Sequence, residues 1–395
     1  MTHQPHGGGP LAGIRVIDLT SIVMGPLATQ LLADLGADVI KIEPPKGDVL
    51  RRIGAPAGST LGPLFMHLNR NKRSVVLDLK SAQDHAALMD LVRGADVFAH
   101  SMRPQAMARL GLGYADIKAV NPQIVYAGMF GFSQSGPAAQ DAAFDDLIQA
   151  SSGIADLIGR TTDGRPRYVP FNMADRSVGM LAFGAISAAL AGRARTGEGC
   201  EIGIPMYETL AGLVLGDHLF GETALPASGP MGYRRIMVRN RGPYPTADGH
   251  ICTMIYTDPQ WRAFLRLLGR DDDLASDPRL KDIAARTRHA DDLFEFVAEH
   301  TRARPTGEWI ALLTGAGLPA VAMRRIEDLL TDPQLAASGF FEEVDHPTQG
   351  RVRLMRCPVE ITGHEPQLLH LPPELGADTA AVLAERNARR GGEIG

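Results

Sequence analysis

The chain has 395 residues, a formal net charge of −5 at neutral pH, 45% hydrophobic residues and 22% charged residues. This length allows one large domain and a smaller one around a substantial core, and the composition is that of a globular protein. The acidic balance argues against a nucleic-acid partner, and no apolar run has the length needed to cross a bilayer, so we expect neither nucleic acid nor membrane as a partner.

The first ten residues, MTHQPHGGGP, lack the charged and apolar blocks of a secretory signal. Residues 1–10 are therefore predicted to form a disordered leader. Cys200, Cys252 and Cys357 are odd in number and widely spaced, which argues against a disulfide framework or a zinc knuckle. The sequence predicts a cytoplasmic protein.

Short β-branched runs alternate with helical patterns from residue 11 to residue 130. Strands are predicted at 14–19, 37–43, 74–79, 95–100 and 123–129, with helices at 25–36 and 82–92. Strands separated by helices of this length indicate βαβ units, so the predicted fold is α/β with a doubly wound parallel sheet. The connection at 44–73 is long for a compact domain, which is typical of a functional loop.

The second half of the chain changes in composition. Helices are expected at 144–153 and 174–192, then a strand at 200–206 and a helix to about residue 220. Gly, Pro and Arg are frequent in 221–246, which is interpreted as a linker. A hairpin pattern and amphipathic helices predict a smaller α+β domain over 247–322. The large domain is then 11–220, completed by 323–395.

Several familiar motifs are absent. The first predicted strand–helix turn, DLTSIVMGP, lacks G-x-G-x-x-G, no P-loop occurs, and Ser135 occupies the last glycine position of a serine-hydrolase elbow in GFSQSG. The histidines form no H-E-x-x-H and no tight cluster, so no metal site is predicted. Glu43 ends the second predicted strand; it is either a ribose ligand or, more commonly for an acid there, a solvated carboxylate.

Asp175 stands where a loop meets a helix of small and apolar residues, in YVPFNMADRSVGMLAFGAISAALAG. Aspartate is a favoured N-cap residue, and the positive end of the helix dipole stabilises its charge, so capping is the ordinary role. An ionised carboxylate held there can also act as a nucleophile. The residues alone leave both roles open.

Six segments in chain order carry a resemblance to a known family: 11–48, 67–81, 110–132, 142–153, 169–190 and 243–251. Together they resemble the family III CoA-transferases, the CaiB/BaiF group, over nearly the whole chain. The resemblance implies that Asp175 attacks an acyl-CoA thioester and passes through acyl-aspartyl anhydride and aspartyl-CoA thioester intermediates. A carboxylate nucleophile suits this exchange, because anhydride and thioester have comparably high transfer potential.

The resemblance also implies partners. An acyl-CoA and a small carboxylic acid are the expected substrates, CoA is a substrate moiety, and no cofactor is permanently bound. The expected assembly is an interlocked homodimer of ring-like chains.

CoA carries phosphates, so its site needs cations or backbone donors. The resemblance places the CoA site at Ile22, Val23, Asn71, Lys72, Arg73, Ser101, Arg103 and Arg109. Each basic residue alone is more often a solvated surface charge. On loops that follow successive strands, the set fits the rule that ligands bind at the carboxyl ends of parallel strands.

Four departures from the family leave alternatives open. Val23 stands where some members have glutamine, Ala142 replaces a basic residue, Ser101 stands where many members have asparagine, and a glycine-rich loop of one branch has no counterpart. A 2-methylacyl-CoA racemase needs a histidine where this chain has Phe144, although Asp258 lies near the place where racemases add an acid. A catalytically silent CoA-binding protein is the other alternative.

Four arginines cluster in YRRIMVRNRG: Arg234, Arg235, Arg239 and Arg241. One hypothesis is that one of them binds a substrate carboxylate, which would favour a dicarboxylic or hydroxy-acid acceptor with succinyl-CoA or a similar donor. An interface or a surface patch is an equally good explanation.

Overall fold

The structure is a computed structural model that describes residues 8–364 and 367–392, and side chains of its last helix as far as Glu385. Contacts group the chain into two units. The first comprises the residues up to Ser152, then Val169–Gly212 and the residues from Gln334 onward; the second comprises Gly153–Tyr168 and Leu213–Pro333. The stretch 221–246, interpreted above as a linker, is grouped with the second unit.

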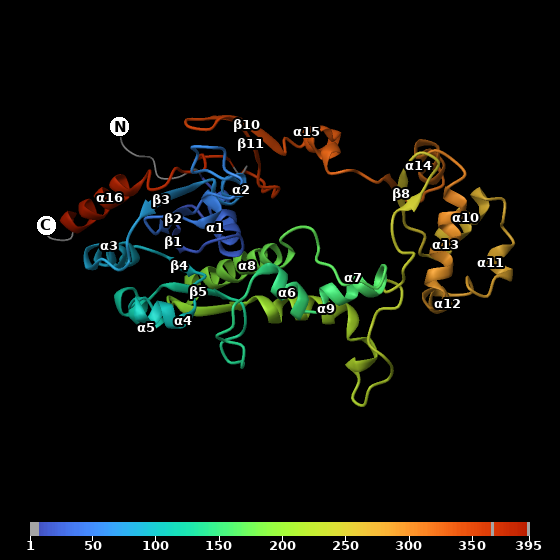
Figure 1. Ribbon diagram of the computed structural model, residues 1–395, viewed down its shortest axis with the longest axis horizontal. Helices are drawn as coiled ribbons and strands as arrows, with labels where there is room; N and C mark the ends of the chain where they lie inside the picture. Colours follow the sequence, from blue (N-terminus) through green and yellow to red (C-terminus); the bar gives the residue numbers. More distant parts are fainter. Residues whose placement is uncertain (1–7, 365–366, 393–395) are drawn as a thin grey trace. The chain divides into compact units, whose positions relative to one another are not determined.

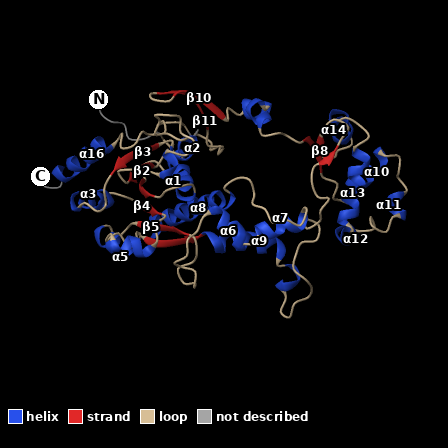
Figure 2. Ribbon diagram, in the orientation of Figure 1, coloured by secondary structure: helices blue, strands red, loops and turns tan. Residues whose placement is uncertain are grey.

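The first unit is built on a parallel sheet of six strands in the order β3-β2-β1-β4-β5-β6 (Figures 1 and 2). Its strands are β1 (Arg15–Leu19), β2 (Asp38–Glu43), β3 (Lys72–Val76), β4 (Val97–His100), β5 (Val125–Phe130) and β6 (Cys200–Pro205). The order reverses between β1 and β4, as in doubly wound folds, where the reversal opens a crevice at the carboxyl ends of the strands. The predicted α/β fold with a doubly wound sheet is confirmed.

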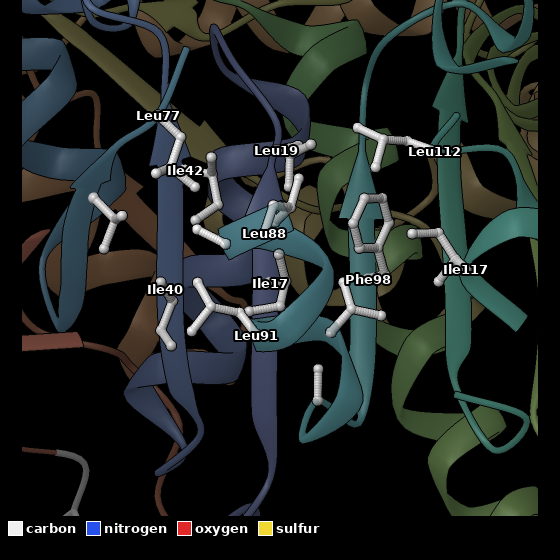
Figure 3. Close-up of a cluster of buried hydrophobic side chains, with 14 of the residues drawn as sticks. Ile17, Leu19, Ile40, Ile42, Leu77, Leu88, Leu91, Phe98, Leu112 and Ile117 are labelled. Carbon is white, nitrogen blue, oxygen red and sulfur yellow. The ribbon is translucent and has the colours of Figure 1, made fainter. Parts of the chain in front are cut away.

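Helices cover both faces of this sheet. They are α1 (Met24–Asp34), α2 (Pro63–Asn69), α3 (Ala82–Arg93), α4 (Pro104–Arg109), α5 (Tyr114–Val120), α6 (Asp145–Ser151) and α8 (Met173–Thr196), with the 3₁₀ turn η1 (Val49–Arg51). Since side chains alternate along a strand, Ile17, Ile40 and Phe98 point to one face, where Leu88 and Leu91 of α3 pack on them (Figure 3). The opposite face is covered by α1 and α8, which pack on each other.

The C-terminal residues return to this sheet. They form α15 (Pro333–Ala337), the hairpin β10 (Phe341–His346) and β11 (Gly350–Met355), and α16 (Thr379–Gly392). Asp378 accepts a hydrogen bond from the backbone N–H of Ser74 at 2.8 Å, and Thr379 Oγ1 accepts one from Val76 N at 3.0 Å. These bonds tie α16 to the edge strand β3, so this segment completes the first unit.

The second unit has its own core. Its elements are α7 (Ile154–Thr161), η2 (Phe220–Thr223), β7 (Tyr244–Pro245), β8 (His250–Thr253), α10 (Asp258–Leu267), α11 (Asp273–Ser276), α12 (Ile283–Arg288), α13 (Ala290–Thr301), α14 (Thr306–Gly315), β9 (Ala320–Ala322) and η3 (Glu327–Thr331); α9 (Met206–His218) begins in the first unit and ends here. The strands form an antiparallel sheet, β7-β8-β9. Trp261, Phe264 and Trp309 are buried together beneath it.

Two expectations need correction. The connection at 44–73 is not a structureless loop, since it contains η1 and α2, whose Phe65 is fully buried. The statement that no apolar run has bilayer-spanning length was too strict: α8 has that length and apolarity, judged by length and composition only. Core helices of soluble proteins meet the same criterion, so α8 is weak support for a membrane span.

Candidate active site

The N-terminus of α8 presents Asp175. Asn172 is the N-cap residue, and its side chain makes no capping hydrogen bond. The carboxylate of Asp145, at the start of α6, accepts the backbone N–H of Asp175 instead, at 2.9 Å. The other oxygen of Asp145 accepts a hydrogen bond from Gln149 Nε2 at 2.6 Å. The capping role considered for Asp175 therefore belongs to Asp145.

This arrangement leaves the Asp175 carboxylate without a hydrogen-bond partner among the described residues. The side chain is half-buried. Burial, reinforced by the negative charge of Asp145, raises the pKa of Asp175 to about 7, and Arg176 opposes the rise. A desolvated acid beside a like charge is a common feature of catalytic sites.

Packing places Asp175 at the carboxyl edge of the sheet. The far end of α8 lies at the amino edge, because Arg193 binds Asp96, the residue before β4, at 2.6 Å. Near its start, α8 approaches α1 so closely that a Cβ on Gly179 would lie 2.6 Å from the carbonyl oxygen of Met24. Asp175 lies one turn before Gly179 on the same side of the helix, close to the β1–α1 turn.

Two cavities open at this edge. The first, about 430 Å³, is lined by residues that follow β1, β2, β3 and β4, and so lies at the reversal of strand order. The second, about 370 Å³, is lined by residues that follow β4 and β5, including Phe144, the neighbour of Asp145. Met102 lines both. Ligand-sized space therefore exists where the sequence rule predicted it.

Buried ion pairs form the floor of the first cavity. Glu43 is 1% exposed and accepts two hydrogen bonds from Arg51, at 2.6 and 2.7 Å, and one from Ser74 Oγ at 2.7 Å. Lys41 pairs with Asp48 at 3.2 Å. The interpretation of Glu43 as a solvated carboxylate was wrong, and its partners also occupy both of the oxygens that a ribose would need.

The run Asn71–Arg73 enters β3 at its amino end, and its side chains bind protein groups. Asn71, at φ +61°, donates to Asp34 and accepts the backbone N–H groups of residues 369 and 370. Lys72 is fully buried, with Asp18 Oδ2 at 3.1 Å and three further oxygens within 3.0 Å. Arg73 pairs with Asp38 and with Glu385. A structural role is evident for all three, and their contact with CoA stays a prediction.

Of the other predicted CoA residues, some line the two cavities and some do not. Ile22 lines the first cavity, and its backbone N–H reaches Asp48 Oδ2 at 3.3 Å with φ at +70°, which is unusual for a β-branched residue. Ser101 and Arg103 line the second cavity. Val23 is 1% exposed in a small apolar cluster, and Arg109 is exposed at the end of α4, outside the lining of both cavities.

The racemase alternative loses support. Phe144, exposed by 66%, supplies no proton-transfer group. Asp258 belongs to the second unit, where its Oδ1 binds Arg286 at 2.5 Å. Of the four clustered arginines, Arg235 is half-buried, whereas Arg234, Arg239 and Arg241 are exposed. The part of the chain that the structure describes contains no group of three or more His, Cys, Asp or Glu side chains able to hold a metal ion.

The residue that sequence reasoning missed is Asp145. Its signal was present in AAFDDLIQ, where an acid opens a predicted helix. The sequence did not indicate that Asp145 would accept the backbone N–H of Asp175, because the two residues are 30 positions apart.

Comparison with known proteins gives a consistent result. The sequence model of CoA-transferase family III matches residues 11–379. The succinate–glutarate CoA-transferase of Agrobacterium fabrum is 33% identical over 98% of both chains. The crystal structure of the D175A mutant of Rv3272 from Mycobacterium tuberculosis has a TM-score of 0.82 at 30% identity, covering 95% of this chain and 99% of that one. A CaiB/BaiF family protein from Brucella suis has a TM-score of 0.79 at 32% identity, over 96% and 100%.

Proposed function

This chain belongs to CoA-transferase family III, and we propose that it moves CoA from an acyl-CoA donor to a free carboxylic acid by covalent catalysis at Asp175. The observation that supports the nucleophile is the state of its carboxylate. The Asp175 carboxylate lies at the carboxyl edge of the sheet without a hydrogen bond from any described residue, because Asp145 caps the helix in its place.

The chemistry proceeds in four balanced steps. A carboxylate oxygen of Asp175 attacks the thioester carbonyl, the C–S bond breaks, and CoA thiolate leaves an acyl-aspartyl anhydride. The thiolate then attacks the aspartyl carbonyl, which releases the donor acid and forms aspartyl-CoA thioester. The acceptor carboxylate attacks this thioester to form a second anhydride and thiolate. Attack of the thiolate on the acceptor's carbonyl yields the new acyl-CoA and restores Asp175.

The surroundings of Asp175 suit this role. The carboxylate must be ionised to attack, so a pKa of about 7 makes it available at neutral pH while leaving it more basic than an ordinary aspartate. Small residues behind it, including Gly179, pack α8 closely on α1. Close packing excludes water, which would hydrolyse an anhydride.

We place CoA along the two cavities. The residues that support this placement are Ile22, Ser101 and Arg103, which line them. Val23 and Arg109 remain proposed contacts. A contact of CoA with Asn71, Lys72 and Arg73 stays a prediction from the sequence that this placement does not include, because these residues lie at the amino end of β3. The acceptor is proposed to be a small carboxylic acid of the dicarboxylic class, on the basis of the activity named for the Agrobacterium relative.

We also propose that the enzyme is an interlocked homodimer in the cytoplasm. Exposed apolar side chains support an interface: Met180 and Leu181 of α8 are 61% and 49% exposed, and Leu213 of α9 is 54% exposed. All three cysteines are unpaired, which suits a reducing compartment. Sedimentation equilibrium tests the assembly, and a monomer at micromolar concentration would contradict it.

Intact-protein mass spectrometry tests the covalent route. The chain is incubated with succinyl-CoA, then treated with borohydride to reduce the aspartyl thioester or with hydroxylamine to trap it. Modification should map to Asp175 and vanish in Asp175→Asn, whereas Asp146→Asn, an exposed acid beside Asp145, should still be modified. Turnover without any adduct, or an adduct on another residue, would overturn the proposal.

A further inference from the structure

The second unit contains a recess that the proposed chemistry does not use. It lies between the start of α10, the α12–α13 pair and the strand β7, and its walls include Tyr244, Tyr256, Trp261 and Phe294. The recess is open to solvent on one side, and its cavity volume is about 30 Å³. A volume of this size holds a group of a few heavy atoms, so a larger apolar body would extend into the mouth of the recess.

One wall carries a guanidinium without an acidic partner. Arg235 stacks over the Tyr256 ring at 4.8 Å and lies 5.6 Å from the Phe294 ring centre. Its only hydrogen bond within the described residues goes to the sulfur of Met254, at 3.2 Å, and sulfur is a weak acceptor. The positive charge of Arg235 is therefore not neutralised by a carboxylate of the described part of the chain.

A second wall carries an unused donor. Arg286 is 7% exposed; its Nη1 donates to the carbonyl of Leu280 at 3.0 Å and its Nη2 to Asp258, while its buried Nε–H has no partner. A buried donor left unpaired is energetically unfavourable. Tyr244, 6% exposed, adds a phenol to the same lining.

From these contacts we propose that the recess binds a small organic carboxylate with an apolar body, of the benzoate type. Its carboxylate pairs with the Arg235 guanidinium, and its ring or alkyl chain lies against the aromatic walls. Guanidinium groups match carboxylates in shape and charge, and Arg235 alone among the four clustered arginines lines such a space. This site goes beyond the proposed reaction and does not depend on covalent catalysis at Asp175.

Fluorine NMR of 4-fluorobenzoate titrated with the full chain tests this directly. We expect saturable binding, weakened about tenfold or more in Arg235→Met, because a charge-assisted hydrogen bond is lost. Arg234→Met, which removes an exposed neighbour, should bind as the wild type does. The neutral analogue 4-fluorobenzamide should bind much more weakly than the acid.

Two further variants test whether the ligand occupies the recess and whether this site is separate from Asp175. Ile283→Trp, at a lining residue that is 48% exposed, fills the recess while both arginines are retained, and it should abolish binding. Asp175→Asn should leave binding intact, which separates this site from the proposed transferase chemistry. Absence of saturable binding, or equal affinities in wild type, Arg235→Met and Ile283→Trp, would overturn the proposal.

Discussion

The entry to β3 and the N-terminus of α8 both hold charged side chains, and the two regions treat charge in opposite ways. Lys72 is buried with a carboxylate and three other oxygens around its ammonium group. Asp175 faces the like charge of Asp145 and has no hydrogen bond among the described residues. Burial still lowers the pKa of Lys72 to about 8, so its internal partners offset the desolvation only in part. The Asp175 carboxylate has no such partners in the described part of the chain, which is typical of a catalytic group.

Asp175→Asn should have the largest effect. The amide has nearly the same shape but no nucleophilic oxygen, so turnover of acyl-CoA should fall by about 10⁴-fold or more. Initial rates of CoA transfer, measured with succinyl-CoA at saturating acceptor, check this. Binding of CoA itself should persist, and a variant that keeps a tenth of wild-type turnover would end the interpretation of Asp175 as nucleophile.

Lys72→Met tests the other side of the comparison. The substitution keeps the apolar stem but leaves Asp18 without one of its two buried cations, so the free energy of unfolding should fall by about 3–5 kcal/mol. Urea denaturation followed by circular dichroism measures the change. If instead stability is unaltered and the Kd for CoA rises tenfold, the predicted CoA contact of Lys72 is favoured over its structural role.

These two regions also show what the sequence revealed and what it did not. The order of strands and helices could be predicted from the periodicity of the hydrophobic residues and from the turn residues between them. The helix predicted at 174–192, for example, corresponds to α8 at Met173–Thr196. The structural partners of the run at 71–73 could not be predicted, because Asp18, Asp34 and Asp38 lie on other elements. Likewise a lone Asp175 looked like a cap, since nothing local indicated that Asp145 would approach from α6.

A third prediction separates the two roles of Asp145. In Asp145→Asn the amide oxygen still caps α8 but the negative charge is gone, so the pKa of Asp175 should fall and the pH–rate profile should move to lower pH. In the wild type, activity should rise with pH through a midpoint near 7, as the carboxylate ionises. Rate measurements from pH 5 to pH 9 check both expectations.

Asp145→Ala completes that test, because it removes the cap as well. We expect a loss of stability of about 0.5–2 kcal/mol, the usual contribution of a helix cap, which Asp145→Asn should largely avoid. Equal pH profiles in the wild type and in Asp145→Asn would mean that burial alone raises the pKa of Asp175.

The smallest expected effect is a gain in stability. Asp175 ionises near pH 7 in the folded chain but near pH 3.9 in an unfolded one, so between these values the folded state binds more protons. Stability is therefore lost as pH rises from about 4 to about 7, and Asp175→Asn should remove that loss. Its melting temperature should exceed the wild type's at pH 8 by a modest amount, because the side chain is only half-buried. Near pH 4.5 the two melting temperatures should be the same. Lys72→Met should melt below the wild type at both pH values. An Asp175→Asn variant that is no more stable at pH 8 would mean that the carboxylate is not held at the expense of the fold, and the contrast between the two regions would then lie in their contacts alone.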